Sequence, residues 1–338
     1  MTIFAGLDVG DKSTHVCVVD GEGATVWRGE CATDPEVLAK TLHRHAPGLT
    51  RVVLETGALS AFLYHGLVER EVPVTCICAR HAKGVLSVRA NKSDAHDAEG
   101  LAQLARTGWF KAVHIKDSAT HLDRAQLKVR EQLVRAHLAM ANQLRGLLKL
   151  FGLRMGKATT PGKRHERLEA LLAQKPALRP ILAPLVAGLA ALEDQIAASS
   201  RSLKVRAAAD PIAARLMSVP GVGPITALTY LSSIEDPGRF AHARDAGAYA
   251  GLAPRRFQSG ERDTKGRISK AGDPMLRSAL YEAANNLLAR VKRPSPLQTW
   301  GKALAATKGA KRARVAVARK LAILLHKLWQ SGASFQWA

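Results

Sequence analysis

The stretch that decides the fold of the N-terminal part is IFAGLDVGDKSTHVCVVDGEGATVWR, residues 3–28. Ile3–Asp8 is a short apolar run, and Ser13–Val19 is rich in β-branched residues, as strands are. The turn residues Gly21-Glu22-Gly23 come next, and Ala24–Arg28 then has the pattern of a third strand. Three short strands joined by tight turns predict a three-strand meander.

Alternating helices and strands are expected after the meander. Asp34–His45 fits a helix, with Asp34 as its N-cap and Pro35 at its first position. Val52–Leu54 has a strand pattern and leads directly into Glu55. Ser60–Glu69 fits another helix and Val72–Ile77 another strand. This order predicts an α/β layer architecture for the N-terminal part of the chain.

The second segment, about residues 115–205, is expected to be helical. Apolar residues recur every three or four positions from Val129 to Phe151, as on one face of a long helix. The pattern breaks at Gly156–Gly162 and resumes over Arg167–Leu172 and Ile181–Leu203. We expect an antiparallel helical hairpin or coiled coil, suited to dimerisation, to nucleic-acid contact or to both.

The third segment opens with LMSVPGVGP, residues 216–224, which has the pattern of a helix-hairpin-helix. Gly221 and Gly223 would let backbone N–H groups reach a DNA phosphate at the start of the second helix. A glycine-rich helix junction with no ligand is the alternative. Further on, Lys308–Lys327 predicts an amphipathic helix with a basic face toward DNA. The predicted domains are therefore 1–112 (α/β), 113–207 (helical) and 208–338 (mainly helical).

Charge is distributed unevenly along the chain, whose net charge is +22. Residues 1–110 hold 11 Lys and Arg and 13 Asp and Glu, which leaves 39 and 15 for residues 111–338. A basic body on a slightly acidic head indicates a polyanion that is held by one part and acted on by another. The alternatives are a ribosomal-type RNA binder and a solvated basic tail.

The expected compartment is the cytoplasm. The four cysteines, Cys17, Cys31, Cys76 and Cys78, have no CxxC or zinc spacing, so four buried thiols are expected. No leader pattern stands at the N-terminus, and no apolar stretch looks long enough to span a membrane. No membrane partner is therefore expected.

Four acidic residues stand where an α/β domain brings carboxylates together. Asp8 ends the first strand, Glu55 follows the fourth, and Asp94 and Asp97 share a helix face at i, i+3 spacing. Such an oxygen-rich cage suits Mg²⁺ or Mn²⁺, and two such ions can clamp a phosphodiester during cleavage. Taken singly, Asp8 could instead cap a turn, Glu55 pair with Arg51, and Asp94 cap a helix.

Three histidines, His15, His81 and His96, also lie near the acidic set. A helix position between or beside the two aspartates points away from their face. No metal role is expected for these histidines.

Several motifs together carry a family resemblance over almost the whole chain. The sequence resembles the DEDD-type transposases of bacterial insertion sequences, the one-ten family, which are relatives of the DNA invertase Piv. The matching stretches are residues 6–10 (GLDVG), Leu54-Glu55, 92–98 (KSDAHDA), 220–224 (PGVGP), 249–254 (YAGLAP), 258–260 (QSG), 266–272 (GRISKAG) and Leu276-Arg277.

The resemblance implies an RNase-H-like, RuvC-like N-terminal domain whose catalytic tetrad is Asp8, Glu55, Asp94 and Asp97. It also implies a C-terminal transposase domain in which Ser259 is the nucleophile, forming a covalent phosphoserine DNA intermediate. The expected activity is cleavage and exchange of DNA strands at insertion-element ends and target. The expected partners are double-stranded DNA, a non-coding bridge RNA and further copies of the chain, as a homodimer or homotetramer.

Ser259 lies among basic residues, and guanidinium groups there could hold a phosphate and offset its charge. The expected nucleic-acid contacts, besides Gly221 and Gly223, are Arg255, Arg256, Arg262, Lys265, Arg267, Lys270 and Arg277. A serine needs activation, which a metal held by the carboxylates could supply in a site composed from both ends of the chain.

Alternatives stay open for the serine and for the function. Ser259 could be a plain turn residue, and Ser269 is the second candidate nucleophile. The protein could also be a RuvC-like, structure-specific nuclease that uses water, or a nucleic-acid-binding protein without chemistry.

Overall fold

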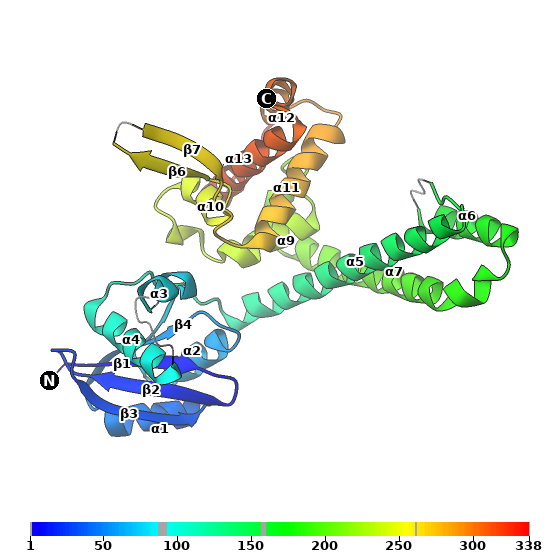
Figure 1. Cartoon of the computed structure of the whole chain (residues 1–338). Coiled ribbons are helices and arrows are strands. Elements are labelled where there is room, and N and C mark those ends of the chain that lie inside the picture. The colour runs from blue at the N-terminus through cyan, green and yellow to red at the C-terminus, as the bar shows by residue number, and fades with distance from the viewer. Residues whose placement is uncertain (1, 87–92, 157–159, 261, 338) are drawn as a thin grey trace. The chain divides into compact units, whose positions relative to one another are not determined.

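The computed structural model describes residues 2–86, 93–156, 160–260 and 262–337. The chain divides into two compact units, Met1–Asp117 and Ser118–Ala338. The first runs from blue to cyan in Figure 1, and the second from cyan-green to red. The second unit holds both segments that the sequence divides at residue 207, and that boundary stays a prediction.

The first unit is built on a five-stranded sheet of order β3-β2-β1-β4-β5. The first three strands form an antiparallel meander, whereas β4 is parallel to β1 and β5 is parallel to β4. The predicted meander is confirmed, and its third strand is longer than predicted. The strands are β1 (Ile3–Val9), β2 (Ser13–Val19), β3 (Thr25–Ala32), β4 (Leu49–Glu55) and β5 (Val74–Ile77).

Helices cover both faces of this sheet, as the α/β pattern predicts. On one face, α1 (Pro35–His45) and α2 (Ser60–Val68) pack against residues such as Leu7 and Leu54. On the other, α3 (Ala79–Leu86) and α4 (Asp94–Thr107) pack against Phe4, Val53 and their neighbours. The predicted cap of α1 is confirmed, since Asp34 accepts hydrogen bonds from the backbone of Glu36 and Val37.

The four cysteines are free thiols. Cys17 and Cys76 are buried, and burial raises the pKa of the Cys76 thiol to about 11. Cys31 and Cys78 are half-buried, so the expectation of four buried thiols is right for two of them. A thiol with a raised pKa is a poor nucleophile, which fits a packing role.

The second unit begins with an antiparallel helical hairpin (Figure 1). Its helices are α5 (Ser118–Leu150), α6 (Pro161–Gln174) and α7 (Leu178–Ala209). Near α6 the hairpin has an apolar core that includes Leu144 and Leu182. Farther along, α5 and α7 are joined by polar pairs: Gln126 with Ser202, Arg130 with Ser200, and His137 with Glu193.

One correction concerns hydropathy. Among the described residues, α7 is the one helix that is long and apolar enough to cross a membrane by composition. The expectation that no stretch reaches this length was therefore wrong. A single such helix is weak support for a membrane protein, and here α7 makes polar contacts with α5.

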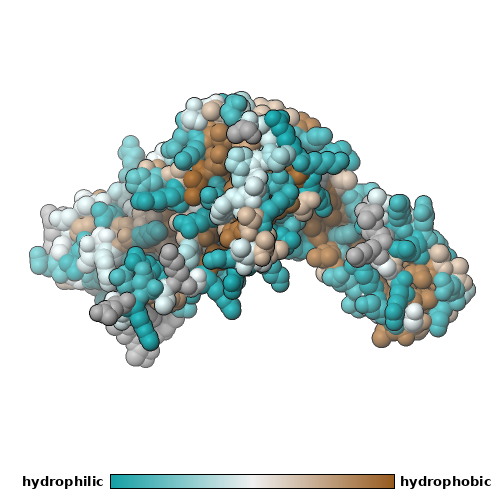
Figure 2. Space-filling view, turned by 90° about the horizontal axis from the view of Figure 1, so that it is seen from above, coloured by the Kyte–Doolittle hydropathy of each residue, from teal (hydrophilic) through white to brown (hydrophobic). Residues whose placement is uncertain are grey.

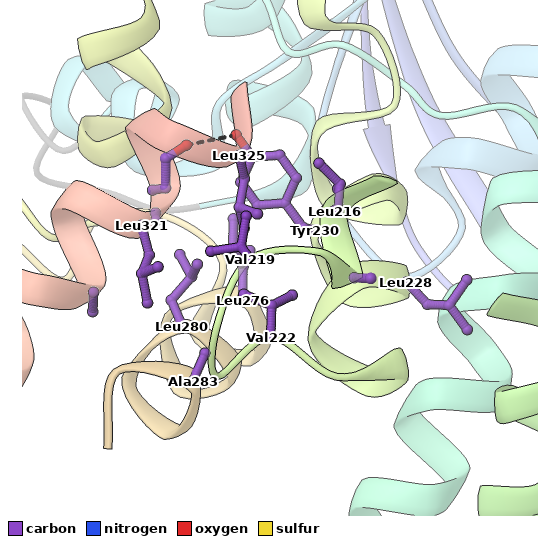
Figure 3. Packing of buried hydrophobic residues seen from close by; sticks show 14 of the residues in the cluster. Leu216, Val219, Val222, Leu228, Tyr230, Leu276, Leu280, Ala283, Leu321 and Leu325 are labelled. Carbon is purple, nitrogen blue, oxygen red and sulfur yellow. Dashed lines mark hydrogen bonds between the residues drawn. The ribbon is translucent and has the colours of Figure 1, made fainter. Parts of the chain in front are cut away.

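The rest of the second unit is a helical bundle with a two-stranded sheet. Its core includes Tyr230, Leu276, Leu280 and Leu321 (Figure 3), and the Tyr230 hydroxyl donates a 2.9 Å hydrogen bond to the Ala322 carbonyl. Most of the predicted helix 308–327 lies in the last helix. The elements are α8 (Pro211–Met217), α9 (Pro224–Ile234), η1 (Pro237–Arg239), α10 (Ala243–Tyr249), β6 (Pro254–Ser259), β7 (Arg262–Ile268), α11 (Pro274–Ala289), α12 (Pro296–Lys308) and α13 (Ala310–Ser331).

The two glycines between α8 and α9 differ in their surroundings. Gly221 has a φ of +87°, and a Cβ there would lie 2.6 Å from the Ala283 carbonyl oxygen of α11. Gly221 therefore allows a turn and a close helix contact. Gly223 is the N-cap of α9, and a Cβ there would meet no atom within 4 Å. The helix-hairpin-helix function of this junction stays a prediction.

A half-buried ion pair joins the hairpin to the bundle. Arg124 of α5 lies 2.7 Å from the Asp273 carboxylate and donates to the Ser233 hydroxyl, which in turn donates to Asp273. Asp273 also caps α11. Burial alone would raise the pKa of Asp273, but the charge and hydrogen bonds of Arg124, with those of Ser233 and the Leu276 backbone, lower it.

We expect Arg124→Met to lower the free energy of unfolding by about 2 kcal/mol, because it leaves a half-buried carboxylate without its charged hydrogen-bond donor. Chemical denaturation measures this loss. A carboxyl with a lowered pKa stabilises the fold above its unfolded pKa, and that contribution is lost as pH falls through the folded pKa. The difference between wild type and variant should therefore shrink in acid.

Arg206→Met is the matched control for this variant. Arg206 pairs with Asp123 on the surface, where its side chain is 44% exposed, so its loss should cost under about 1 kcal/mol. If both variants lost the same free energy of unfolding, the Arg124–Asp273 pair would contribute no more to stability than a surface ion pair.

Candidate functional site

Asp8 and Glu55 lie side by side on neighbouring strands. β1 and β4 are parallel, and Leu7 pairs with Leu54, so Asp8 and Glu55 are the next residues along the two strands. Alternate residues of a strand face the same side. Phe4 and Val53 belong to the core under α4, and the same alternation puts both carboxylates on the α4 face of the sheet.

Helix α4 approaches β1 so closely that only glycine fits between them. A Cβ on Gly6 would lie 2.2 Å from the Ala98 carbonyl oxygen and 2.3 Å from the Ala102 nitrogen. Asp94 is one turn before Ala98, and Asp97 directly precedes it. The contact at Gly6 therefore fixes the first turn of α4 near the end of β1 that carries Asp8.

Polar contacts fix the orientation of α4 relative to the strands of the sheet. Glu99 forms a 2.9 Å ion pair with Arg28 of β3. Gln103 and Arg106 donate to the carbonyls of Gly23 and Gly21, in the turn between β2 and β3. That turn is at the Phe4 end of β1, so the N-terminal turn of α4 points to the Asp8 end.

The helix cap settles one of the alternatives for the single acids. The N-cap of α4 is Ser93, whose hydroxyl accepts from the His96 backbone, so Asp94 is left in the first turn and does not cap it. Arg51 donates to the Ala105 carbonyl and lies over the Phe110 ring. Lys92, the first residue of the KSDAHDA motif, lies outside the described residues.

The strand register adds a histidine that sequence reasoning had set aside. His15 of β2 pairs with Asp8, and paired residues of an antiparallel ladder share a face. His15 and Glu30 of β3 line a cavity of about 250 Å³ with Ala95 of α4. The row Glu30, His15, Asp8, Glu55 thus crosses the sheet. The predicted meander already places a residue of the second strand opposite Asp8, and this is the sequence signal that could have identified His15.

The carboxylates are near one another without forming a closed metal cage. Among the residues that the structure describes, no group of three or more His, Cys, Asp or Glu side chains is close enough to hold a metal ion. Asp8, Glu55 and Asp97 each make contacts of their own. Asp94 is exposed. The donor set is chemically suited to Mg²⁺ or Mn²⁺, and binding would draw these oxygens closer.

Ser259 is the last residue of β6, and the loop expected around it is a β-hairpin. This corrects the sequence expectation, which had no strands in this part of the chain. Ser259 pairs with Arg262 of β7, so the two side chains share a face. Every residue of β6 is exposed. Gly260, directly after the serine, has a φ of +54°, which favours glycine.

The basic residues around Ser259 lie on different faces of the hairpin or at its base and have different hydrogen-bond partners. Arg256 is on the opposite face and binds Asp263 through two hydrogen bonds of 2.8 and 2.9 Å. Arg255 donates to the Ser269 carbonyl. Arg277 donates to the carbonyls of Ala250 and Lys270, and so braces the base of the hairpin. Lys270 itself is exposed, as is Arg267, and the side chain of Lys265 lies outside the described atoms.

Comparison with known families gives matches at both ends of the chain. A model described as "Transposase IS116/IS110/IS902 family" matches residues 213–299. A second, described as "Transposase" and named for the DEDD domain of IS110, matches residues 5–152. The transposase of insertion sequence element IS1111A from Coxiella burnetii is 32% identical over 96% of this chain and 88% of its own length. The chain belongs to the IS116/IS110/IS902 family of transposases.

Other relatives of this transposase have similar names. A probable family 20 transposase of Pseudomonas aeruginosa is 33% identical, over 71% of this chain and 73% of its own. The transposase of element IS1328 from Yersinia enterocolitica is 28% identical, over 85% and 84%. The RuvC structure of Thermus thermophilus covers 33% of this chain and 99% of its own, at 19% identity and a TM-score of 0.25.

Family membership makes this protein an enzyme that cleaves and recombines DNA. The predicted recognition is confirmed, and so is DNA as the substrate class. The N-terminal match includes Asp8, Glu55, Asp94 and Asp97, whereas the C-terminal match includes Ser259 and the hairpin. The roles of these residues are a matter for proposal.

We expect Gly6→Ala to lower DNA cleavage by the transposase at least tenfold and its free energy of unfolding by about 1–3 kcal/mol, because the methyl group must push α4 off β1. A cleavage assay on element-end DNA and a denaturation curve measure the two effects. Gly146→Ala is the control, since a Cβ there meets no atom within 4 Å. If Gly6→Ala cleaved DNA at the wild-type rate, the position of α4 on β1 would not be required for activity.

Proposed function

We propose that this transposase cleaves and rejoins DNA with a divalent metal site at Asp8, Glu55, Asp94 and Asp97 and with Ser259 as the nucleophile. The observation that carries the proposal is the strand register, which puts Asp8 and Glu55 next to each other on the face that α4 covers. The first turn of α4 then supplies Asp94 and Asp97 from above that face. An RNase-H-like, RuvC-like architecture for this domain is part of the proposal.

The four carboxylates would hold Mg²⁺ or Mn²⁺, which when bound stabilises charge on the phosphate oxygens. The chain's own contribution is the placement of the donors. Gly6 sets the distance between helix and strand, while Glu99 and Gln103 set the helix direction.

Ser259 would supply the oxygen that attacks the scissile phosphorus. A bond forms between Oγ and phosphorus, the serine gives up its proton, and the bond from phosphorus to one strand's oxygen breaks as that oxygen gains a proton. The hydroxyl oxygen of another strand then bonds to phosphorus and gives up its proton, while the bond from phosphorus to Oγ breaks and Oγ regains a proton. Arg262, which pairs with Ser259, would be the cation that holds the phosphate.

Two further parts of the proposal concern partners. The basic second unit would hold double-stranded DNA together with a non-coding bridge RNA that directs it to its target. As a second candidate for the cleavage step alone, the carboxylates would act as a RuvC-like nuclease that uses water, because they suit hydrolysis as well as transfer.

The variants Asp8→Asn and Ser259→Ala should separate the two halves of this chemistry. In Mg²⁺, Asp8→Asn should reduce cleavage of element-end DNA at least a hundredfold. Ser259→Ala should eliminate strand exchange and any protein–DNA adduct that resists denaturant, because it removes the attacking oxygen. Denaturing gels with labelled DNA measure the adduct, and salt-dependent binding shows that both variants still hold DNA.

Ser269→Ala is the matched control for the serine. The Ser269 hydroxyl accepts from the Ala271 backbone, and this variant should keep the adduct. An adduct that persists in Ser259→Ala and disappears in Ser269→Ala would identify Ser269 as the nucleophile. Cleavage by wild type with no adduct under trapping conditions would favour the nuclease.

We also propose that the α5–α7 hairpin joins two copies of the chain. Beside these polar pairs α5 exposes Val134 and Leu138, which lie one helical turn apart, the last 57% exposed. Figure 2 shows apolar residues in brown beside hydrophilic ones in teal on the hairpin surface at the right. Leu144, by contrast, is buried in the hairpin's own core, so it cannot report on a second copy.

If the hairpin is the contact between copies, Leu138→Glu should raise the dissociation constant of the oligomer at least tenfold by placing a charge in the apolar contact. Analytical ultracentrifugation measures the change. Gln132→Glu adds a charge at an exposed polar position and should leave association unchanged. Should Leu138→Glu associate like wild type, the oligomer, if one forms, uses another surface.

A further inference from the structure

A large cavity lies between the base of the β6–β7 hairpin and helices α12 and α13. Its volume is about 1260 Å³, above the range typical of small-molecule pockets. Leu252 and Ile268 line it from the hairpin side, and Val315 and Ile323 line it from α13. Every residue that lines the cavity belongs to the second unit, and none of the four carboxylates lines it.

Cations surround this apolar lining. Among the described residues that line the cavity none is acidic, and six are basic: Arg267, Lys270, Lys311, Arg312, Arg319 and Lys320. Six like charges around one cavity repel one another, and a bound polyanion would relieve that repulsion. An apolar lining with a basic rim fits a ligand that has flat apolar faces as well as negative charges.

Arg319 lacks an acceptor that the fold would normally provide. Its Nε is buried and has no hydrogen-bond partner in the described part of the chain. Its side-chain stem packs against Gly247 of α10, where a Cβ would lie 3.0 Å from the arginine Cγ. The packed stem holds Arg319 in place, and because this residue also lines the cavity, its guanidinium group is a cation for a ligand bound there.

Trp300 of α12 supplies an aromatic surface in the same cavity. Its ring is 37% exposed, and the Lys320 Nζ lies 4.2 Å from the ring centroid. Trp300 also lines a neighbouring cavity of about 520 Å³ with Pro294 and Pro296. An indole beside lysine and arginine is the combination on which nucleobases stack while their phosphates are neutralised.

We propose that this cavity binds an unpaired nucleotide of a nucleic-acid strand, with the base against Trp300 and the phosphates on Arg319 and the neighbouring cations. A paired base keeps its faces inside the duplex stack and cannot cover the apolar lining. The inference rests on the proposed role of the second unit in holding nucleic acid, and it does not depend on Ser259 or on the carboxylates. The strand is DNA or RNA, which share this chemistry.

The test is binding of short labelled strands to the full-length protein, measured by fluorescence anisotropy. The probes are a single-stranded DNA, an RNA of the same sequence, the DNA duplex, and a single strand whose central nucleotides are abasic. We expect Trp300→Leu to weaken binding of the preferred single strand roughly tenfold and to have little effect on the duplex. The abasic strand should bind wild type and Trp300→Leu equally, because it keeps the phosphates and lacks the base.

Arg319→Met keeps the stem that packs on Gly247 and removes the guanidinium, so it should weaken both the normal and the abasic strand. The matched controls are Trp337→Leu and Arg290→Met, which lie in the same unit outside the cavity and should bind like wild type. Trp300→Phe should restore most of the affinity, and thermal unfolding confirms that each variant is folded.

Three results would overturn the inference. One is equal binding by Trp300→Leu and wild type on both single strands. Another is an equal loss on the normal and the abasic strand, and the third is a loss confined to the duplex. No probe has to be cleaved in this assay, so a wrong nucleophile assignment leaves this test intact. The preferred single strand, DNA or RNA, identifies the ligand.

Discussion

The close contact between α4 and β1 at Gly6 is the constraint on which the candidate catalytic centre depends. Two elements that are distant in sequence meet with no side chain between them, so small shifts in one are transmitted to the other. Asp8 is two residues after Gly6 on the strand, and Asp97 directly precedes the helix residue that Gly6 touches. A single glycine thus sets the distance between the two halves of the proposed tetrad.

The second unit depends on a different kind of contact. Arg124, Ser233 and Asp273 come from α5, α9 and the start of α11, and one carboxylate binds the other two residues while capping a helix. The apolar core around Tyr230 supplies most of the buried surface, whereas this polar network fixes the geometry at one point. Packing and polar contacts together orient the hairpin on the bundle.

Much of the fold could be predicted from local patterns. Alternating β-branched residues gave the meander, and Asp34 with Pro35 gave the start of α1, because those signals act within a few residues. The β6–β7 hairpin was missed, since its arginine-rich sequence has no apolar alternation and none of the residues of β6 is buried. The partner of Arg277 could not be predicted either, because it depends on carbonyls brought together by the tertiary fold.

The candidate site shows the same division. The types and spacing of Asp8, Glu55, Asp94 and Asp97 were visible in the sequence, together with a family pattern that needs no structure. His15 was set aside because one-dimensional spacing does not show which residue stands opposite Asp8. The cavity at Trp300 gathers residues from three separate stretches, and no spacing within one stretch predicts it.

The exposed β6–β7 hairpin has a consequence for the timing of the reaction. A two-stranded ribbon with no side chain of β6 buried is marginally stable by itself, so its shape is set largely by what it binds. If Ser259 is the nucleophile, as proposed above, the serine would be held in a reactive position only when nucleic acid lies along the ribbon. On that proposal the enzyme would stay unreactive toward most of a genome and would react only at a fully bound site, so it would gain specificity at the expense of rate.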